Sequence, residues 1–199
     1  YEVWEDQELK AIFLADYFPR SGKRPGAWMT SYRGQKKING QRIIPQVSIV
    51  CNFAPSTESQ PSLLKFDEVK TLFHEFGHAL HGMLADTKYE SLSGTSVLWD
   101  FVELPSQIFE NWCYESECLR LFAHHYETEE VIPSEYIDRI KLAATFHEAY
   151  AMMRQLSFAI LDLSLHNKNY AATENIDSIE RLEKEILGAI NLFPDIPDT

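Results

Sequence analysis

The stretch His74-Glu75-Phe76-Gly77-His78 constrains this chain more than any other. Because an α-helix turns once in about 3.6 residues, positions i and i+4 lie on one face, and both histidines can then hold one ion through their ring nitrogens. Glu75 lies about a third of a turn aside, where it is badly placed to be a ligand but can reach a water on the ion. The pattern predicts a helix that carries two metal ligands and the general base Glu75.

The residues around this motif have helical periodicity. At about 100° per residue, six apolar side chains cluster on one side of the helix, away from the histidines. These are Val69, Leu72, Phe76, Ala79, Leu80 and Met83. His74, His78 and His81 share the opposite side, where a merely solvated face would more typically carry Glu and Lys. Gly77 lies between the two ligands and indicates that another part of the protein approaches the helix closely there, since glycine inside a helix costs up to ~1 kcal/mol relative to alanine.

A third ligand is needed, and the sequence excludes one way of supplying it. The pattern H-E-x-x-H-x-x-G-x-x-H requires Gly and His where this chain has His81 and Leu84. Glu103 is the better candidate: it begins a second helical pattern, in which Pro105 falls in the tolerant first turn. The set His74, His78 and Glu103 is then typical of a catalytic zinc site with one open position. The alternatives are His81 as third ligand, and Glu103 as an ordinary acidic residue at a helix N-terminus.

The second helical pattern carries a polar stripe among apolar residues. The stripe consists of Glu103, Gln107, Glu110 and Tyr114, whereas Leu104, Ile108 and Trp112 cover another side. A buried polar stripe needs partners, and the face with three imidazoles would provide them. We therefore expect Gln107 or Glu110 to accept a hydrogen bond from the outer nitrogen of a ligand histidine, with a plain polar contact as the alternative.

With these motifs, the chain resembles the zinc oligopeptidases, the family that includes thimet oligopeptidase, neurolysin, oligopeptidase A and bacterial peptidyl-dipeptidase. The resemblance rests on five blocks in family order. They are Phe-Pro-Arg-Ser-Gly-Lys-Arg-Pro-Gly-Ala-Trp-Met (18–29), Ile-Val-Cys-Asn-Phe (49–53), Phe-Asp-Glu-Val-Lys-Thr-Leu-Phe-His-Glu-Phe-Gly-His-Ala-Leu-His-Gly (66–82), Ser-Gly-Thr (93–95) and Asp-Phe-Val-Glu-Leu-Pro-Ser-Gln (100–107). The similarity is greatest to peptidyl-dipeptidase, which removes dipeptides from peptide C-termini.

The resemblance implies a zinc peptidase acting on short peptides, with His74, His78 and Glu103 on one Zn²⁺ and Glu75 as base. It also implies a zincin-like (gluzincin) catalytic half. Family members are much longer, with an N-terminal helical half and a C-terminal segment that binds substrate and stabilises the tetrahedral intermediate. We therefore expect residues 1–199 to be one partial catalytic domain, weakly active without those missing parts.

Composition narrows the remaining possibilities. The chain has 199 residues, 45% of them hydrophobic, and a net charge of −12. The hydrophobic fraction is that of a globular protein, and the negative net charge argues against a nucleic-acid partner. The sequence has three cysteines, Cys51, Cys113 and Cys118, without C-x-x-C spacing, which favours a cytoplasmic protein. It shows neither a signal peptide nor an apolar run of membrane length, so we expect no membrane partner. The rival functions are a non-catalytic zinc- or peptide-binding domain and a purely structural helical domain.

The order of the predicted elements gives the fold class. Residues 1–65 are rich in strand patterns and residues 66–199 in helical ones, which indicates an α+β fold. Val3-Trp4 and residues 9–18 suggest a hairpin, and Asn39-Gly40 is a strong signal for a second. Val47–Phe53 is predicted to be a strand of a small sheet whose edge could receive an extended peptide, and residues 56–62 a loop.

The last third of the chain is predicted to be helical. Residues 134–167 suggest one long helix that buries apolar side chains. Those expected to be buried are Ala143, Ala144, Phe146, Tyr150, Met153, Leu156, Ile160 and Leu163. His147-Glu148 lacks a second histidine at Ala151 and is not expected to bind metal. Asp177 and Glu180 resemble a capping box that opens a last helix ending near Gly188.

Overall fold

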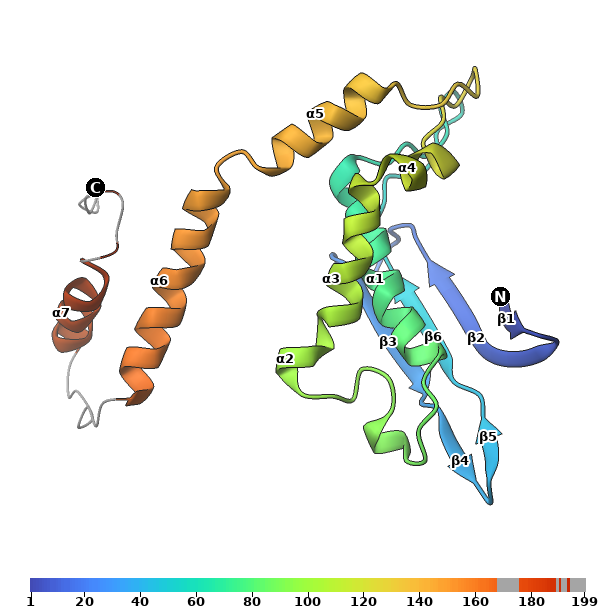
Figure 1. The fold of residues 1–199 in the computed structure, drawn as a ribbon, viewed down its shortest axis with the longest axis horizontal. Helices are drawn as coiled ribbons and strands as arrows, with labels where there is room; N and C mark the ends of the chain where they lie inside the picture. Colours follow the sequence, from blue (N-terminus) through green and yellow to red (C-terminus); the bar gives the residue numbers. More distant parts are fainter. Residues whose placement is uncertain (168–175, 189, 191–192, 194–199) are drawn as a thin grey trace. The chain divides into compact units, whose positions relative to one another are not determined.

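The computed structural model describes residues 1–167, 176–188, 190 and 193. The chain divides into two compact units, Tyr1–Ile137 and Asp138–Thr199. In the first unit six strands precede the first helix, so the predicted α+β class is confirmed (Figure 1).

A mixed four-stranded sheet forms the base of the first unit, in the order β1-β2-β6-β3. Strand β1 (Glu2–Glu5) pairs antiparallel with β2 (Glu8–Asp16), which confirms the first predicted hairpin. Strand β6 (Gln46–Val50) runs parallel to β2 and antiparallel to β3 (Trp28–Arg33). Long connections, rather than tight turns, therefore join the strands around β6.

The predicted strand Val47–Phe53 is confirmed as a member of the small sheet, with one correction to its bounds. Strand β6 ends at Val50, three residues earlier than expected. It also lies inside the sheet, because β2 and β3 pair with its two sides, so β6 has no edge to offer a peptide. Alternating hydrophobicity identifies a strand but does not give its place in a sheet. Among the described residues, β3 is the edge strand on this side.

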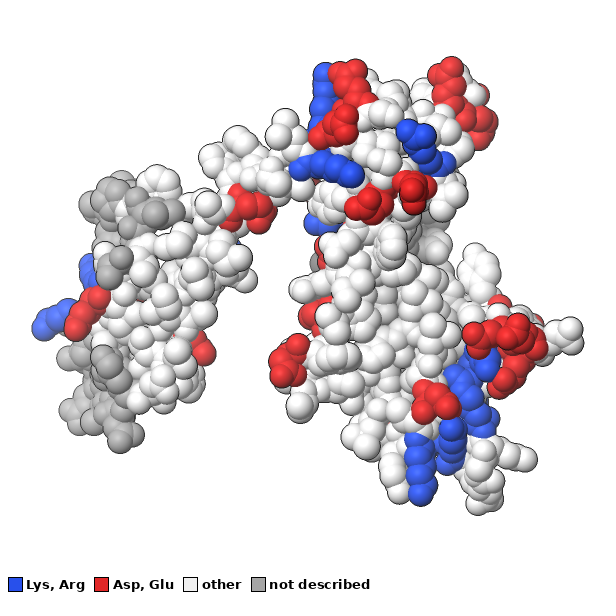
Figure 2. All heavy atoms as spheres, viewed as in Figure 1, with Lys and Arg blue, Asp and Glu red and all other residues white. Residues whose placement is uncertain are grey.

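A separate hairpin joins β3 to β6. It consists of β4 (Lys36–Ile38) and β5 (Gln41–Ile43). Asn39 and Gly40 both have positive φ, 52° and 80°, as the predicted two-residue turn requires. Figure 2 shows basic side chains interspersed with acidic ones in this region, and ion pairs such as Lys36–Glu90 and Lys37–Asp86 link the hairpin to the segment after the first helix.

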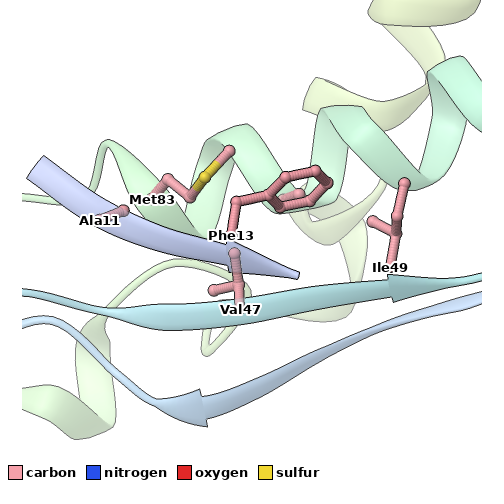
Figure 3. Close-up of a cluster of buried hydrophobic side chains, with 6 residues drawn as sticks. Ala11, Phe13, Val47, Ile49 and Met83 are labelled. Atoms are coloured by element: carbon pink, nitrogen blue, oxygen red, sulfur yellow. The ribbon is translucent and has the colours of Figure 1, made fainter. Parts of the chain in front are cut away.

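Helix α1 (Phe66–Met83) packs on the sheet through the predicted apolar face, of which Ala79 and Met83 are buried and Leu72, Phe76 and Leu80 are partly buried. The core lies between α1 and strands β2 and β6 (Figure 3). Its buried members are Ala11, Phe13, Val47, Ile49, Ala79 and Met83. Phe76 meets Phe13 edge-on, with 5.4 Å between ring centroids. This packing fixes the rotation of α1, so the histidines on its other side face away from the sheet.

Short helices follow α1. They are η1 (Glu90–Leu92), α2 (Trp99–Val102), α3 (Leu104–Glu110), η2 (Asn111–Tyr114) and α4 (Ser116–Phe122). Helix α3 lies alongside α1 (Figure 1). A loop over residues 51–65 joins β6 to α1 and includes the predicted loop 56–62.

The predicted single helix over residues 134–167 is wrong. The structure has α5 (Ser134–Ala144) and α6 (Glu148–Asn167), separated by three residues with i→i+3 hydrogen bonds and a positive φ of 60° at His147. Burial was also overpredicted: Phe146 and Leu163 are exposed, and no residue of α6 is buried. Of the eight residues named for this face, Ala144 and Met153 are half-buried and the others exposed. Periodicity identifies an apolar face but does not supply the surface that covers it.

Helix α7 (Ile176–Leu187) begins one residue before Asp177 and ends next to Gly188, close to the predicted bounds. The residues before it and the Asp177 side chain, on which the capping box depends, lie outside the described residues. Among the described helices, none combines the length and apolar character that a bilayer span requires.

Candidate metal centre

The three predicted ligands come together on the side of α1 that faces α3. The Nε2 atom of His74 lies 3.2 Å from Oε2 of Glu103, and Nε2 of His78 lies 3.1 Å from the same oxygen. One ligand atom from each residue falls within a group no wider than 4.8 Å. Two imidazole nitrogens and a carboxylate oxygen form the donor set that zinc favours at catalytic sites.

Glu103 reaches the histidines because α3 packs unusually close to α1. It sits between α2 and α3, as the residue that caps α3, with Pro105 in the first turn. Gly77 permits the approach: a Cβ added to Gly77 would lie 2.6 Å from Cα of Ser106 and 2.8 Å from the carbonyl oxygen of Pro105. The close approach predicted at Gly77 is therefore confirmed, and α3 is the element that makes it.

Ser106 holds the Glu103 carboxylate in place. Its hydroxyl, which is buried, donates to Oε2 of Glu103 at 2.6 Å. This hydrogen bond lowers the pKa of Glu103, with His78 and His74 acting in the same direction. The carboxylate is thus kept ionised, as a metal ligand must be.

Glu110 supports His74 from the other side of its ring. Oε1 of Glu110 lies 2.7 Å from Nδ1 of His74, which leaves Nε2 facing Glu103. The expectation that Gln107 or Glu110 would reach a ring nitrogen is thus confirmed for Glu110, whereas Gln107 is exposed. The other Glu110 oxygen lies 3.5 Å from Nζ of Lys70. Such an arrangement fixes the ring orientation and the tautomer.

The structure does not bring His81 into the group. Its ring packs near Phe101, with 6.1 Å between centroids, and its buried Nδ1 has no hydrogen-bond partner within the described part of the chain. Burial lowers the pKa of His81. It also lowers the pKa of His78, and this effect outweighs the opposing effect of Glu103. A neutral imidazole is the form that can bind a metal, so His78 is prepared for that role.

Glu75 lies beside the three-residue group but points toward the sheet. It is buried, and burial raises the pKa of its carboxyl. His74 lowers this pKa and Glu103 raises it, while a backbone hydrogen bond from Met29 of β3 lowers it slightly. The carboxyl therefore touches the edge strand and stands next to His74. From this position the carboxyl can exchange protons with a molecule that lies between β3 and the three-residue group.

A cavity of ≈ 360 Å³ opens next to the group. Its walls include His74, Glu75 and Glu110, with Lys70 on the preceding turn of α1 and Ala27 just before β3. The Asn52 side chain donates to the carbonyl oxygens of Arg24 and Gly26, which anchors the loop that carries Ala27. This cavity thus adjoins both the group of His74, His78 and Glu103 and the edge strand.

The residues described above are accompanied by clear similarity to known peptidases. The model of Peptidase family M3 matches residues 1–199. Oligopeptidase A of Escherichia coli (strain K12) is 44% identical over 164 residues, which cover 81% of this chain and 24% of that protein. Dipeptidyl carboxypeptidase of Salmonella typhimurium (strain LT2) is 38% identical over 200 residues, or 98% of this chain and 29% of that protein. A probable cytosolic oligopeptidase A of Arabidopsis thaliana is 37% identical over 194 residues, covering 94% and 27%.

Fold and site together define a metallopeptidase-like arrangement, with two histidines and a glutamate on one helix and a second glutamate beside them. The chain belongs to Peptidase family M3, as the sequence resemblance predicted. It spans about a quarter of the length of the curated relatives named above.

Two contributors to the site were missed from the sequence. Ser106 lies three residues after Glu103, and Lys70 lies four residues before His74. Both spacings place the side chain on the same helix face as the functional residue, so extending the helical projection by one turn would have found them. The contact of Met29 with Glu75 had no such signal, because it arises from the packing of β3 against α1.

Proposed function

We propose that this chain contains the active site of a zinc metallopeptidase that hydrolyses short peptides and releases dipeptides from their C-termini. The observation that carries the proposal is the convergence of His74, His78 and Glu103, with Glu75 beside them. Membership of Peptidase family M3 supports a metallopeptidase. The names of the relatives, oligopeptidase A and dipeptidyl carboxypeptidase, support peptides as substrates and dipeptides as products.

Zinc fits the residues present. The site offers two imidazole nitrogens and one carboxylate oxygen as donors, and Glu110 fixes the outer nitrogen of one histidine. When bound, zinc supplies the Lewis acidity that polarises a peptide carbonyl and acidifies water. His74, His78 and Glu103 would hold it.

Glu75 is proposed to be the general base and then the general acid. Its carboxyl takes a proton from the attacking water and passes that proton to the nitrogen of the leaving amine. The raised pKa suits both transfers, because a base with a pKa nearer to neutrality is also a usable acid. The sheet holds Glu75 through the backbone of Met29, so its position is fixed before the substrate arrives.

The substrate is proposed to lie along β3. This strand has a free edge in the described structure, and Glu75 contacts its backbone. An extended peptide added to that edge would gain main-chain hydrogen bonds and would pass between β3 and the ligand group. This arrangement is typical of a zincin-like catalytic half, which we propose for residues 1–199 as one partial catalytic domain.

Metal content and turnover of the full-length gene product test the proposal. The wild type should bind one zinc and cleave short peptides, and Glu75→Gln should keep the zinc but lose turnover by on the order of 10³-fold or more. Replacing both His74 and His78 by alanine should abolish stoichiometric zinc binding.

The rival functions give different results. A non-catalytic zinc- or peptide-binding domain would hold zinc but show no turnover dependent on Glu75. A structural helical domain would hold no zinc. Zinc retained at one per chain in the double histidine variant would exclude the proposed ligands.

A further inference from the structure

We propose that the ammonium group of Lys70 binds the C-terminal carboxylate of the substrate and so sets cleavage two residues from the peptide's end. The inference rests on the proposed function and deepens it, because it names the residue that would make the enzyme release dipeptides. It follows from the direction of β3, the position of Lys70 on α1 and the length of a dipeptide.

Strand β3 and helix α1 run in the same direction (Figure 1). Just before β3, Ala27 lines the cavity of ≈ 360 Å³ together with Lys70 and His74, which lie in the first half of α1. Toward its end, Ser31 lines a second cavity, of ≈ 220 Å³, together with Gly82 near the end of α1. The metal ligands therefore lie between two cavities, one at each end of the strand.

This arrangement fixes which way a bound peptide points. Antiparallel pairing is the more stable way to add a strand to an edge. A peptide antiparallel to β3 would place its N-terminal part at the smaller cavity, near Ser31. Its C-terminal part would then lie in the larger cavity, beside Ala27 and Lys70.

The distance along α1 matches two residues of substrate. Lys70 precedes His74 by four residues, a rise of about 6 Å along the helix axis. Two residues of extended peptide span about 7 Å. When the scissile bond lies at the level of His74 and Glu75, the carboxylate of a leaving dipeptide therefore lies at the level of Lys70. A longer leaving segment would extend past this lysine.

Lys70 can accept such a ligand. Its side chain is about one-third exposed at the cavity, and its contact with Glu110 is long, at 3.5 Å. Although burial acts to lower the pKa of Lys70, its hydrogen bond with Tyr114 and its interactions with Glu110 raise it, so the ammonium stays charged. An ammonium has three donors, and the substrate carboxylate would take one in a charge-assisted hydrogen bond. Because the carboxylates of Asp67 and Glu110 also line this cavity and repel an anion, Lys70 is the group in its lining that a substrate carboxylate would bind.

The test uses one oligopeptide in two forms, with a C-terminal carboxylate or a C-terminal carboxamide. The full-length gene product is compared with Lys70→Met, with Lys70→Arg, and with Lys65→Met as a control on an exposed lysine of the same helix start. We expect the wild type, Lys70→Arg and Lys65→Met to prefer the carboxylate form by kcat/KM. Lys70→Met should lose about tenfold or more on the carboxylate form, with little change on the carboxamide form and unchanged zinc content.

Several results would overturn the inference. One is a wild type whose kcat/KM shows no preference for the carboxylate peptide. The others are a Lys70→Met variant that loses kcat/KM equally on the carboxylate and carboxamide peptides, or one that loses it on neither. An equal loss with weaker zinc binding would show that Lys70 acts through Glu110 and His74 instead. Competitive inhibition by a free dipeptide gives a second readout: Lys70→Met should weaken it, and a dipeptide amide should inhibit both proteins equally. If the proposed function itself failed, the wild type would show no zinc-dependent cleavage of either peptide.

Discussion

Gly77 lies where helix α1 and helix α3 touch, next to the proposed metal ligands, so Gly77→Ala should damage the site more than the fold. The added Cβ would lie 2.6 Å from Cα of Ser106, whereas carbon atoms pack best at about 3.5–4.0 Å. Backbone atoms cannot rotate away, so α3 must retreat by about 1 Å. Glu103, three residues before Ser106, would move with it. Metal–ligand distances tolerate only about 0.2 Å, so zinc affinity should fall by about 10–100-fold or more.

The effect of Gly77→Ala on stability should be modest. Overpacking costs typically 1–3 kcal/mol, while alanine in place of glycine inside a helix gains up to ~1 kcal/mol. We therefore expect the free energy of unfolding of the metal-free protein to fall by about 0–3 kcal/mol, measured by urea titration. Zinc affinity is measured by competition with a chelator of known affinity.

Gly82→Ala is the matched control, on the same helix. There the added Cβ would meet only side-chain atoms, Cγ1 of Val47 at 3.1 Å and Cε of Met29 at 3.3 Å. These can shift by a few tenths of an ångström, so zinc affinity should change less than threefold, well inside the ~10-fold lower bound for Gly77→Ala. If Gly77→Ala bound zinc as tightly as Gly82→Ala, the argument that Gly77 positions Glu103 would be refuted.

Two further predictions concern the support of His74 and the cysteines. Glu110→Ala should weaken zinc binding by about 10–100-fold, because the outer nitrogen of His74 loses its partner, and Gln107→Ala should not; equal effects in a chelator competition would contradict this. Cys51 and Cys113 are buried, and burial raises the pKa of each thiol to about 11. In alkylation at about pH 8 followed by mass spectrometry, the partly exposed Cys118 should react first, and prior reaction of Cys51 or Cys113 would count against the packing described.

Much of the site could be predicted because its chemistry is local in the sequence. The spacing of His74, Glu75 and His78 already places them on one helix, and the apolar residues around them indicate which side of that helix faces the core. Glu103 could be predicted only by combining the start of a second helical pattern with the need for a third ligand. The choice of Glu110 over Gln107 required the structure, since the two lie on the same helix face and differ only in how α3 rotates against α1.

Features of the fold that depend on contacts between distant parts of the chain could not be predicted. The place of β6 inside the sheet depends on its pairing with both β2 and β3, which no local pattern encodes. The break between α5 and α6 falls at Thr145, Phe146 and His147, which have only moderate helix propensity, and the positive φ at His147 interrupts the helix there. The apolar side chains of α6 were expected to be buried, but burial requires a covering surface, and periodicity cannot supply one.

The most direct test of the central claim is a crystal structure of the full-length gene product with zinc, with anomalous data collected at the zinc edge. We predict one strong peak at about 2.0–2.2 Å from Nε2 of His74, Nε2 of His78 and a carboxylate oxygen of Glu103. Glu75 should lie beside the ion without binding it. A peak coordinated by His81 in place of Glu103, or no peak near these residues at full zinc loading, would contradict the account.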